Sequence, residues 1–85
     1  MAERNGAQVT VQYFAVLRDQ RGVGSERVST AAATAGELYE ELRRKHGFTL
    51  NQKMLKVAVN DEFAGWDAPL KDGDKVVFLT PVAGG

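Results

Sequence analysis

Residues 34–47 read TAGELYEELRRKHG and predict a capped amphipathic helix. Thr34 and Glu37 match a capping box, in which the side chains of the N-cap and of the third helical residue accept hydrogen bonds from backbone amides. Basic side chains fill the last turn, where cations interact favourably with the helix dipole, and Gly47 suits the left-handed position that ends a helix. Apolar side chains recur at helical spacing, at Ala35, Leu38, Tyr39 and Leu42. We therefore expect one main helix over residues 35–46.

Strand patterns precede this helix. Residues 8–14 (QVTVQYF) alternate polar and apolar side chains, which places Val9, Val11 and Tyr13 on one face of a strand. Residues 19–24 contain two glycines and predict a turn, so residues 26–29 are expected to form the second strand of a hairpin.

More strand patterns follow the helix. Residues 55–60 (LKVAVN) alternate and predict a strand, residues 60–61 a turn, and residues 63–66 a short strand or a loop. Residues 71–74 (KDGD) predict a turn before a last strand at 75–80, which Pro81 ends because proline cannot donate to a sheet ladder. This order predicts an α+β fold of the β-grasp, or ubiquitin-like, type, a mixed sheet of four or five strands with the helix on one face.

The length of 85 residues indicates one domain. We expect the polar residues 1–7 to be flexible, residues 8–81 to form the domain, and residues 82–85 to be a flexible tail. Apolar runs are far shorter than the roughly 20 residues of a membrane-spanning helix, and the N-terminal residues lack the apolar core of a signal peptide. The sequence therefore predicts a cytoplasmic protein.

The composition excludes several classes of function. The 11 basic and 11 acidic residues cancel, so the net charge favours neither nucleic acid nor an anionic membrane as a partner. The chain has no cysteine and one histidine, which argues against disulfides, a cysteine nucleophile and a zinc site. His46 ends the predicted helix and is interpreted as a surface group favoured by the dipole rather than as a base. The acidic pairs 61–62 and 72–74 flank predicted turns and are interpreted as solvated turn residues.

The remaining candidate for chemistry is the end of the chain, Gly84 and Gly85. Glycines lack a Cβ atom, so such a backbone can enter a narrow channel in another protein. A carboxylate is a poor electrophile, but once it is adenylated it can be attacked, and a sulfur nucleophile would leave a thiocarboxylate. Glycines also occur at inert, frayed termini, so the pair by itself leaves both interpretations open.

Four motifs in combination resemble one family. They are FAVLR at 14–18, VAVN at 57–60, PLKDGDKV at 69–76 and PVAGG at 81–85. From about residue 9 to residue 85 the chain is similar to the small subunit of molybdopterin synthase, the MoaD family. The resemblance implies the β-grasp fold and a Gly85 carboxylate that a MoeB-like enzyme adenylates with ATP and that is then converted to a thiocarboxylate.

The resemblance also implies the partners. The charged tail is expected to enter the active site of a MoaE-like large subunit and to donate sulfur to cyclic pyranopterin monophosphate, in a heterotetramer whose catalytic side chains lie on the large subunit. No cofactor is expected to be bound by this chain. Partner contacts are expected from Phe14, Phe63 and Leu79, from Arg18, and from the tail residues Pro81, Val82 and Ala83.

The sequence offers a test of the docking residues. The last strand carries apolar side chains on both of its faces, with Val76 and Phe78 on one and Val77 and Leu79 on the other. A strand with only one buried face needs apolar side chains on that face alone. If Val9 faces the helix, Phe14 points to the opposite side of the sheet. Exposure of Phe14, Phe63 and Leu79 together would favour partner binding over a role in the core. Trp66 is expected in the core or at its rim.

Three alternatives stay open at this point. A ThiS-like carrier for thiazole synthesis or a CysO-like carrier for cysteine synthesis would use the same tail chemistry. A ubiquitin-like protein modifier would join Gly85 to lysines of other proteins. A structural β-grasp module with an inert tail would use no chemistry at all.

Overall fold

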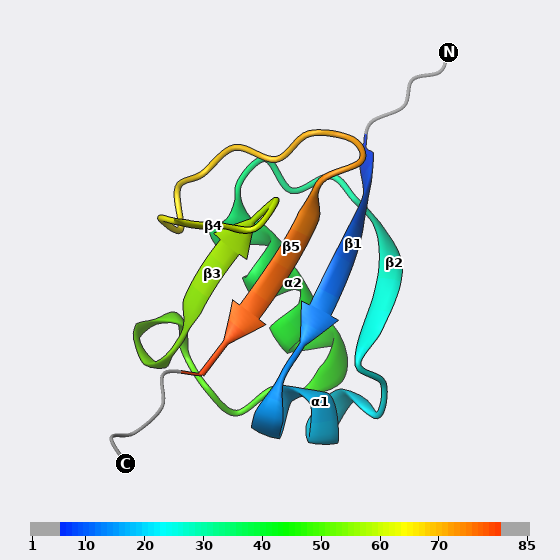
Figure 1. Ribbon diagram of the computed structural model, residues 1–85. Helices are drawn as coiled ribbons and strands as arrows, with labels where there is room; N and C mark the ends of the chain where they lie inside the picture. Colours follow the sequence, from blue (N-terminus) through cyan, green and yellow to red (C-terminus); the bar gives the residue numbers. More distant parts are fainter. Residues whose placement is uncertain (1–5, 81–85) are drawn as a thin grey trace.

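Five strands form one mixed sheet in the computed structural model, which describes residues 6–80 (Figure 1). The spatial order is β2-β1-β5-β3-β4, in which β5 runs parallel to β1 and every other neighbouring pair is antiparallel. The first and last strands therefore lie side by side in the middle of the sheet. Their bounds are β1 (Ala7–Tyr13), β2 (Ser25–Thr30), β3 (Lys56–Val59), β4 (Glu62–Ala64) and β5 (Lys75–Leu79). The predicted α+β, β-grasp architecture is confirmed.

The main helix, α2 (Ala35–His46), has the predicted bounds. The Thr34 Oγ1 accepts a hydrogen bond from the Glu37 amide at 3.2 Å, and the Glu37 carboxylate accepts one from the Ala33 amide at 2.8 Å. Gly47 ends the helix with a φ of 75°, a left-handed conformation that glycine adopts without steric cost. Figure 1 shows α2 behind the sheet, while the face of the sheet toward the viewer carries no helix.

The core lies between α2 and one face of the sheet. That face presents alternate strand residues, including Val11, Val57 and Phe78, which are at most 1% exposed. Tyr39 of α2 packs edge-on against Phe78, with ring centroids 5.1 Å apart. Burial of each such side chain stabilises the fold by roughly 1.5–3 kcal/mol. Trp66 stacks on Phe78 with centroids 6.0 Å apart and is only partly buried, which confirms a place at the rim of the core.

One helix was not predicted. The sequence indicates a turn at residues 19–24, but α1 (Ala15–Arg21) already occupies the first half of that stretch, and the glycine turn begins only at Gly22. Leu17 is the only buried residue of α1, and no side chain caps its start, so the usual signals of a helix are absent. Phe14 was expected to be the last residue of the strand, whereas it is the N-cap of α1.

Smaller differences concern element ends. The 3₁₀ helix η1 (Gln52–Met54) was not predicted, because three residues are too few to show a period. The first strand begins one residue earlier than predicted, β3 is shorter by one residue at each end, and β4 is Glu62–Ala64 rather than residues 63–66. Within residues 6–80, no helix is long and apolar enough to cross a membrane.

Candidate functional site

The candidate residues fall into two groups. The proposed chemical group, Gly84 and Gly85, and the neighbouring candidates Pro81, Val82 and Ala83 lie outside the described residues. The structure places the other four candidates: Phe14, Arg18, Phe63 and Leu79.

Phe63 lies on the sheet surface opposite α2, which we call the outer face. Strand pairing sets Gln12 beside Val77, Val77 beside Ala58, and Ala58 beside Phe63, so these side chains form a row across four strands. Val77 and Ala58 are 7% and 8% exposed, whereas Phe63 is 74% exposed. Val77, an apolar residue of β5 that points away from α2, is therefore part of the outer face.

Phe14 and Leu79 lie next to each other on this face. Tyr13 pairs with Phe78 in parallel, and both point into the core. The following residues, Phe14 and Leu79, therefore turn to the outer face, because Phe14 keeps an extended backbone with φ −129° and ψ 156°. Phe14 is 39% exposed and Leu79 is partly exposed. We call Phe14, Ala58, Phe63, Val77 and Leu79 the outer patch.

The turn between β3 and β4 determines where Phe63 lies. Asn60 and Asp61 have φ values of 53° and 73°, as the two-residue type I′ turn of a β-hairpin requires. The Asn60 side chain donates to Asp74 Oδ1 and accepts from the Lys75 amide, both at 2.9 Å. These bonds fasten the hairpin to the start of β5. The local sequence and one tertiary contact together therefore place Phe63 on the outer face, opposite Ala58.

Three of the four residues in the acidic pairs support the turns, as predicted, whereas Glu62 begins β4. Asp72 Oδ1 accepts a hydrogen bond from the Gln8 amide, and Asp74 Oδ2 accepts one from the Lys71 amide, both at 2.8 Å. Asp61 forms an exposed ion pair with Lys75 at 2.9 Å, which contributes at most about 1 kcal/mol.

Arg18 is exposed on α1, one helical turn after Phe14. Its carbonyl accepts the hydrogen bond from the Gly22 amide that closes the helix, at 2.8 Å. Arg18 therefore lies on α1 rather than on the sheet that carries the outer patch.

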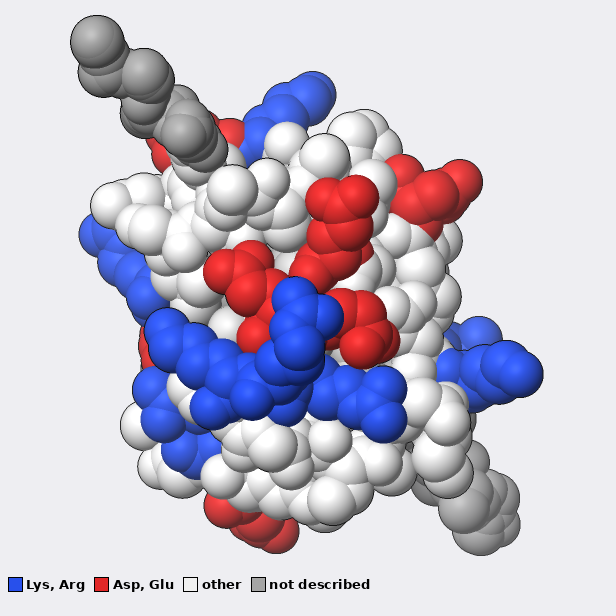
Figure 2. All heavy atoms as spheres, turned by 180° about the vertical axis from the view of Figure 1, so that it is seen from behind, with Lys and Arg blue, Asp and Glu red and all other residues white. Residues whose placement is uncertain are grey.

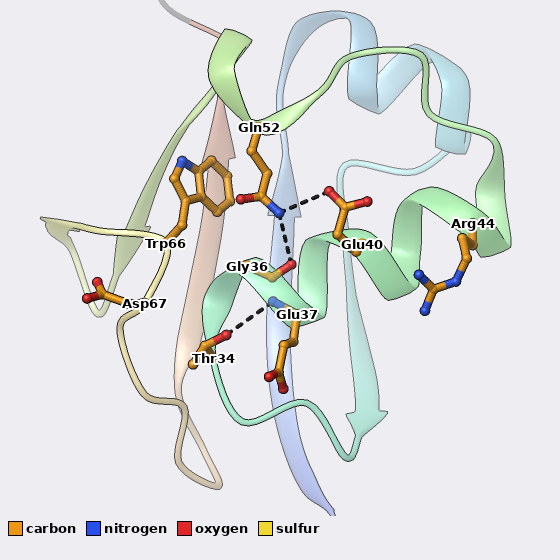
Figure 3. A pocket seen from close by; sticks show the side chains of 8 residues that line it. All are labelled: Thr34, Gly36, Glu37, Glu40, Arg44, Gln52, Trp66 and Asp67. Atoms are coloured by element: carbon orange, nitrogen blue, oxygen red, sulfur yellow. Dashed lines mark hydrogen bonds between the residues drawn. The ribbon is translucent and has the colours of Figure 1, made fainter.

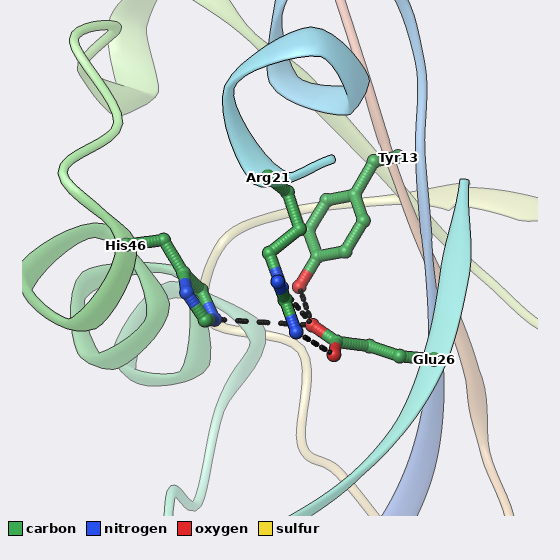
Figure 4. Close-up of polar contacts among 4 residues, drawn as sticks. All are labelled: Tyr13, Arg21, Glu26 and His46. Atoms are coloured by element: carbon green, nitrogen blue, oxygen red, sulfur yellow. Dashed lines mark hydrogen bonds and ion pairs between the residues drawn. The ribbon is translucent and has the colours of Figure 1, made fainter. Parts of the chain in front are cut away.

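A polar cluster that the sequence did not indicate joins α1, β1 and β2 (Figure 4). Arg21 binds the Glu26 carboxylate with two hydrogen bonds of 2.9 and 2.6 Å, and the Tyr13 hydroxyl donates to the same carboxylate at 2.7 Å. The bonds from Arg21, and secondarily that from Tyr13, lower the pKa of Glu26 to about 2. Burial, and then the hydrogen bond to Glu26, raises the pKa of Tyr13. The cluster fastens α1 to the sheet beside Phe14.

His46 differs from its interpretation as a surface group. Its side chain is only 15% exposed, and its Nε2 lies 3.8 Å from Glu26 Oε2. Burial, followed by the positive charge of Arg21, lowers the pKa of His46. The neutral form is therefore favoured over the cation that a role in the helix dipole assumes. The histidine fills space beside Phe48, with ring centroids 5.7 Å apart.

A shallow polar hollow of about 570 Å³ lies between the first turns of α2, η1 and Trp66 (Figure 3). Its polar groups bind one another. Gln52 donates to the Gly36 carbonyl at 3.2 Å and to Glu40 at 2.9 Å, and the Gly36 amide donates to the Trp66 carbonyl at 2.8 Å. A Cβ atom at residue 36 would lie 3.0 Å from that carbonyl oxygen, so glycine allows the close approach. These contacts position Trp66 and η1 against α2.

The two faces of the molecule differ in character. Figure 2 shows the face that carries α2, where acidic side chains gather next to a band of basic ones. The acidic residues of α2 come first, from Glu37 to Glu41, and the basic residues follow from Arg43 to Lys45. The outer face, in contrast, exposes Phe14 and Phe63. The outer face is therefore the one suited to burial in a complex.

Comparisons with known proteins agree on one family. A model described as the ThiS family matches residues 11–85. The molybdopterin synthase sulfur carrier subunit of Escherichia coli (strain K12) is 31% identical to this chain over 80 residues, which cover 91% of this chain and 99% of that protein.

Solved structures share the fold. A putative molybdopterin converting factor subunit 1 from Pyrococcus furiosus is 31% identical, with a TM-score of 0.74, over 89% of this chain and 99% of that one. The small archaeal modifier protein 1 of Haloferax volcanii is 25% identical, with a TM-score of 0.77, over 91% of this chain and 100% of that one.

Two further structures are complexes. One holds subunits 1 and 2 of the molybdopterin-converting factor from Helicobacter pylori 26695, and the matching chain is 30% identical, with a TM-score of 0.62 and coverage of 92% and 99%. The other is the BexX/CysO complex of Amycolatopsis orientalis, with 31% identity, a TM-score of 0.65 and coverage of 91% and 99%. This chain thus resembles proteins that bind a second protein. It belongs to the ThiS family, in the MoaD/ThiS group of small ubiquitin-like sulfur carriers.

Proposed function

We propose that this chain is the sulfur-carrying small subunit of a molybdopterin synthase. The observation that carries the proposal is the outer patch, an apolar surface on which Phe14 and Phe63 are exposed. It includes the partly exposed Leu79 of β5, the strand that leads directly into the glycine-terminated tail. The 31% identity with the molybdopterin synthase sulfur carrier subunit, over nearly all of that protein, supports the same conclusion.

The chemistry takes place at the Gly85 carboxylate. A MoeB-like enzyme joins the carboxylate to the AMP part of ATP and releases pyrophosphate. A donor persulfide then attacks the acyl carbon and AMP leaves, which forms an acyl disulfide. A second thiol attacks the donor sulfur of this S–S bond, so that the thiocarboxylate leaves and the two thiols end as a disulfide. ATP is consumed by the activating enzyme and is not a cofactor of this chain.

The outer patch supplies the docking surface in this proposal. A MoaE-like large subunit covers Phe14, Phe63 and Leu79 and receives the tail in its active site, where sulfur passes to cyclic pyranopterin monophosphate. Exposed aromatic side chains are common anchors of protein interfaces because burying them in a complex is strongly favourable. Two small subunits on a central large-subunit dimer complete the heterotetramer.

Intact mass spectrometry tests the chemistry. The full chain, incubated with its activating enzyme, ATP and a sulfur donor, is expected to gain about 16 Da, the exchange of one oxygen for sulfur. Omission of ATP and deletion of Gly85 serve as controls that should show no gain. An unchanged mass under conditions that charge the Escherichia coli carrier would refute the proposal.

A CysO-like carrier is the second candidate, favoured by the 31% identity with the chain in the BexX/CysO complex. Both candidates use the same thiocarboxylate, so only the acceptor separates them. The charged protein is therefore offered to a large molybdopterin synthase subunit with its pterin substrate, and separately to a CysO-dependent cysteine synthase. Sulfur transfer to the pterin alone supports the first candidate, and transfer to the cysteine precursor alone supports the second.

A further inference from the structure

Charge is distributed unevenly over the outer face, which is toward the viewer in Figure 1. On the five strands within residues 6–80, the positions that alternate with the core residues carry basic side chains and no acidic one. The basic residues are Arg27 of β2, Lys56 of β3 and Lys75 of β5. Lys75 pairs with Asp61 of the β3–β4 turn, whereas no carboxylate in this part of the chain pairs with Lys56.

Lys56 lies between two apolar residues of the outer patch. On one side it pairs with Leu79 of β5. On the other side, Ala58 of β3 pairs with Phe63 of β4, which makes Phe63 a diagonal neighbour of Lys56, within reach of a long side chain. Lys56 and Phe63 also line the same hollow at the β4 side of the sheet, and both are exposed. A surface that covers Phe63 and Leu79 therefore also covers Lys56.

Covering Lys56 removes water from its ammonium group. A buried ammonium without a negatively charged or hydrogen-bonding partner is strongly unfavourable. A carboxylate at hydrogen-bond distance offsets the lost hydration and can make a net favourable contribution to binding. A lysine stem can also bend toward solvent, but here its neighbours on both sides lie under the same covering surface. A partner that covers the outer patch is therefore expected to supply a carboxylate of its own.

The same features select the class of partner. A second copy of this chain presents the same outer face, whose strand positions hold no carboxylate for Lys56. Nucleic acids and anionic membranes are bound by several cations together, whereas Lys56 is a single charge among apolar side chains. A different protein, with an apolar surface that contains one carboxylate, fits the outer patch best.

We propose that Lys56 belongs to the docking surface, and that the large synthase subunit presents an aspartate or glutamate carboxylate to its ammonium group when it covers the outer patch. A protein that offers a similar apolar surface without this carboxylate leaves Lys56 unpaired and binds more weakly. Phe14 and Phe63 thus contribute buried area, and Lys56 contributes to the choice of partner. The inference rests on the proposed function, because it names the chemistry of the partner that this function requires.

Titration calorimetry of the full chain with the purified large subunit tests the proposal. Lys56→Met keeps the length of the side chain but removes its charge, and it should weaken binding at least about tenfold. Lys56→Glu should weaken binding further, and Lys56→Arg should retain most of the affinity. Lys45→Met is the matched control and should bind like the unmodified chain. Lys45 is an exposed lysine of α2, on the opposite face, and its loss changes the net charge by the same amount.

Charge reversal on both proteins identifies the carboxylate. Against Lys56→Glu, replacing the facing acidic residue of the large subunit with lysine should restore at least about tenfold in affinity, whereas replacing other acidic residues should not.

Two results would overturn the proposal: binding of Lys56→Met that equals or exceeds that of the unmodified chain, or an equal loss from Lys45→Met. Binding of the unmodified chain that does not depend on Lys56 rejects only the ion pair. If the unmodified chain does not bind the large subunit at all, the proposed function fails as well.

Discussion

The side chains of Asn60 and Asp74 join the turn after β3 to the turn before β5, through a hydrogen bond of 2.9 Å from Asn60 Nδ2 to Asp74 Oδ1. Asn60 also accepts a hydrogen bond from the Lys75 amide, and Asp74 accepts one from the Lys71 amide. Asn60 ends the VAVN motif and Asp74 ends the DGD motif on which the family resemblance rests. Both motifs therefore have a structural role, which is to hold the β3–β4 hairpin that carries Phe63.

Substitution of Asn60 separates its two contributions. Asn60→Gly keeps the left-handed backbone but removes both side-chain hydrogen bonds, which should lower the free energy of unfolding by about 1–2 kcal/mol. Asn60→Ala should cost roughly 1 kcal/mol more, because a Cβ atom is unfavourable at a φ of 53°. Urea denaturation of the unmodified chain and the two variants measures their free energies of unfolding, which are expected to fall from the unmodified chain to Asn60→Gly to Asn60→Ala. An alanine variant more stable than the glycine variant would contradict this order.

Glu26 makes the stability depend on pH. Its pKa of about 2 in the folded chain lies below the ordinary value of 4.5. Between these two pH values the folded state therefore binds fewer protons than the unfolded state. The stability from this group is present above pH 4.5 and is lost toward pH 2. Glu26→Gln should therefore destabilise the chain at pH 7, by about 1 kcal/mol after solvent screening, and much less at pH 2.5.

Thermal unfolding of both proteins across this pH range measures the effect of Glu26→Gln. Glu62→Gln, at an exposed glutamate at the start of β4, is the control and should change little at either pH. If Glu26→Gln and the unmodified chain differ in stability by the same amount at pH 7 and at pH 2.5, the charged carboxylate does not contribute to the stability.

Phe63→Ala tests the outer patch as a docking surface. Because Phe63 is 74% exposed, its removal should change the free energy of unfolding by no more than about 0.5 kcal/mol. The affinity for the large synthase subunit should fall at least about tenfold, as for an aromatic anchor of an interface. Val23→Ala is the matched control, an exposed apolar residue between α1 and β2. Titration calorimetry that finds equal affinity for Phe63→Ala and the unmodified chain would place docking elsewhere.

Ala15 tests the unpredicted helix. Its φ of 54° is unfavourable for any residue with a Cβ atom and worst for a β-branched one. Ala15→Val should lower the free energy of unfolding by about 1–2 kcal/mol, whereas Ala15→Gly should leave it nearly unchanged or raise it slightly. Guanidinium unfolding measures both variants, and a valine variant as stable as the glycine variant would show that α1 begins differently.

Several elements could be predicted because their signals are local. The cap at Thr34, the apolar period and Gly47 determined both ends of α2. Alternation located β1 and β3 to within one residue at their ends, and Asn60 with Asp61 indicated the hairpin turn. The helix α1 offered no such signal, because one buried residue, Leu17, shows no period.

The polar cluster could not be predicted for a different reason. Tyr13, Arg21, Glu26 and His46 come from four elements, and Glu26 meets His46 across 20 positions of sequence. No local pattern distinguishes these residues from other charged or aromatic side chains on strands and helices. The interpretation of His46 as a surface group failed because burial and partners are properties of the folded chain.

The sequence by itself determined the helix, the strands, the class of fold and the absence of cysteine chemistry, because caps, side-chain periods and composition act between near neighbours or need no neighbour at all. The tertiary structure alone decided which apolar residues of β5 are buried under α2 and which remain on the outer face. Both parities of β5 are apolar, so alternation cannot choose between them. The pairing of β5 with β1 and β3 makes the choice, and it sets Leu79 beside Phe14 and Lys56.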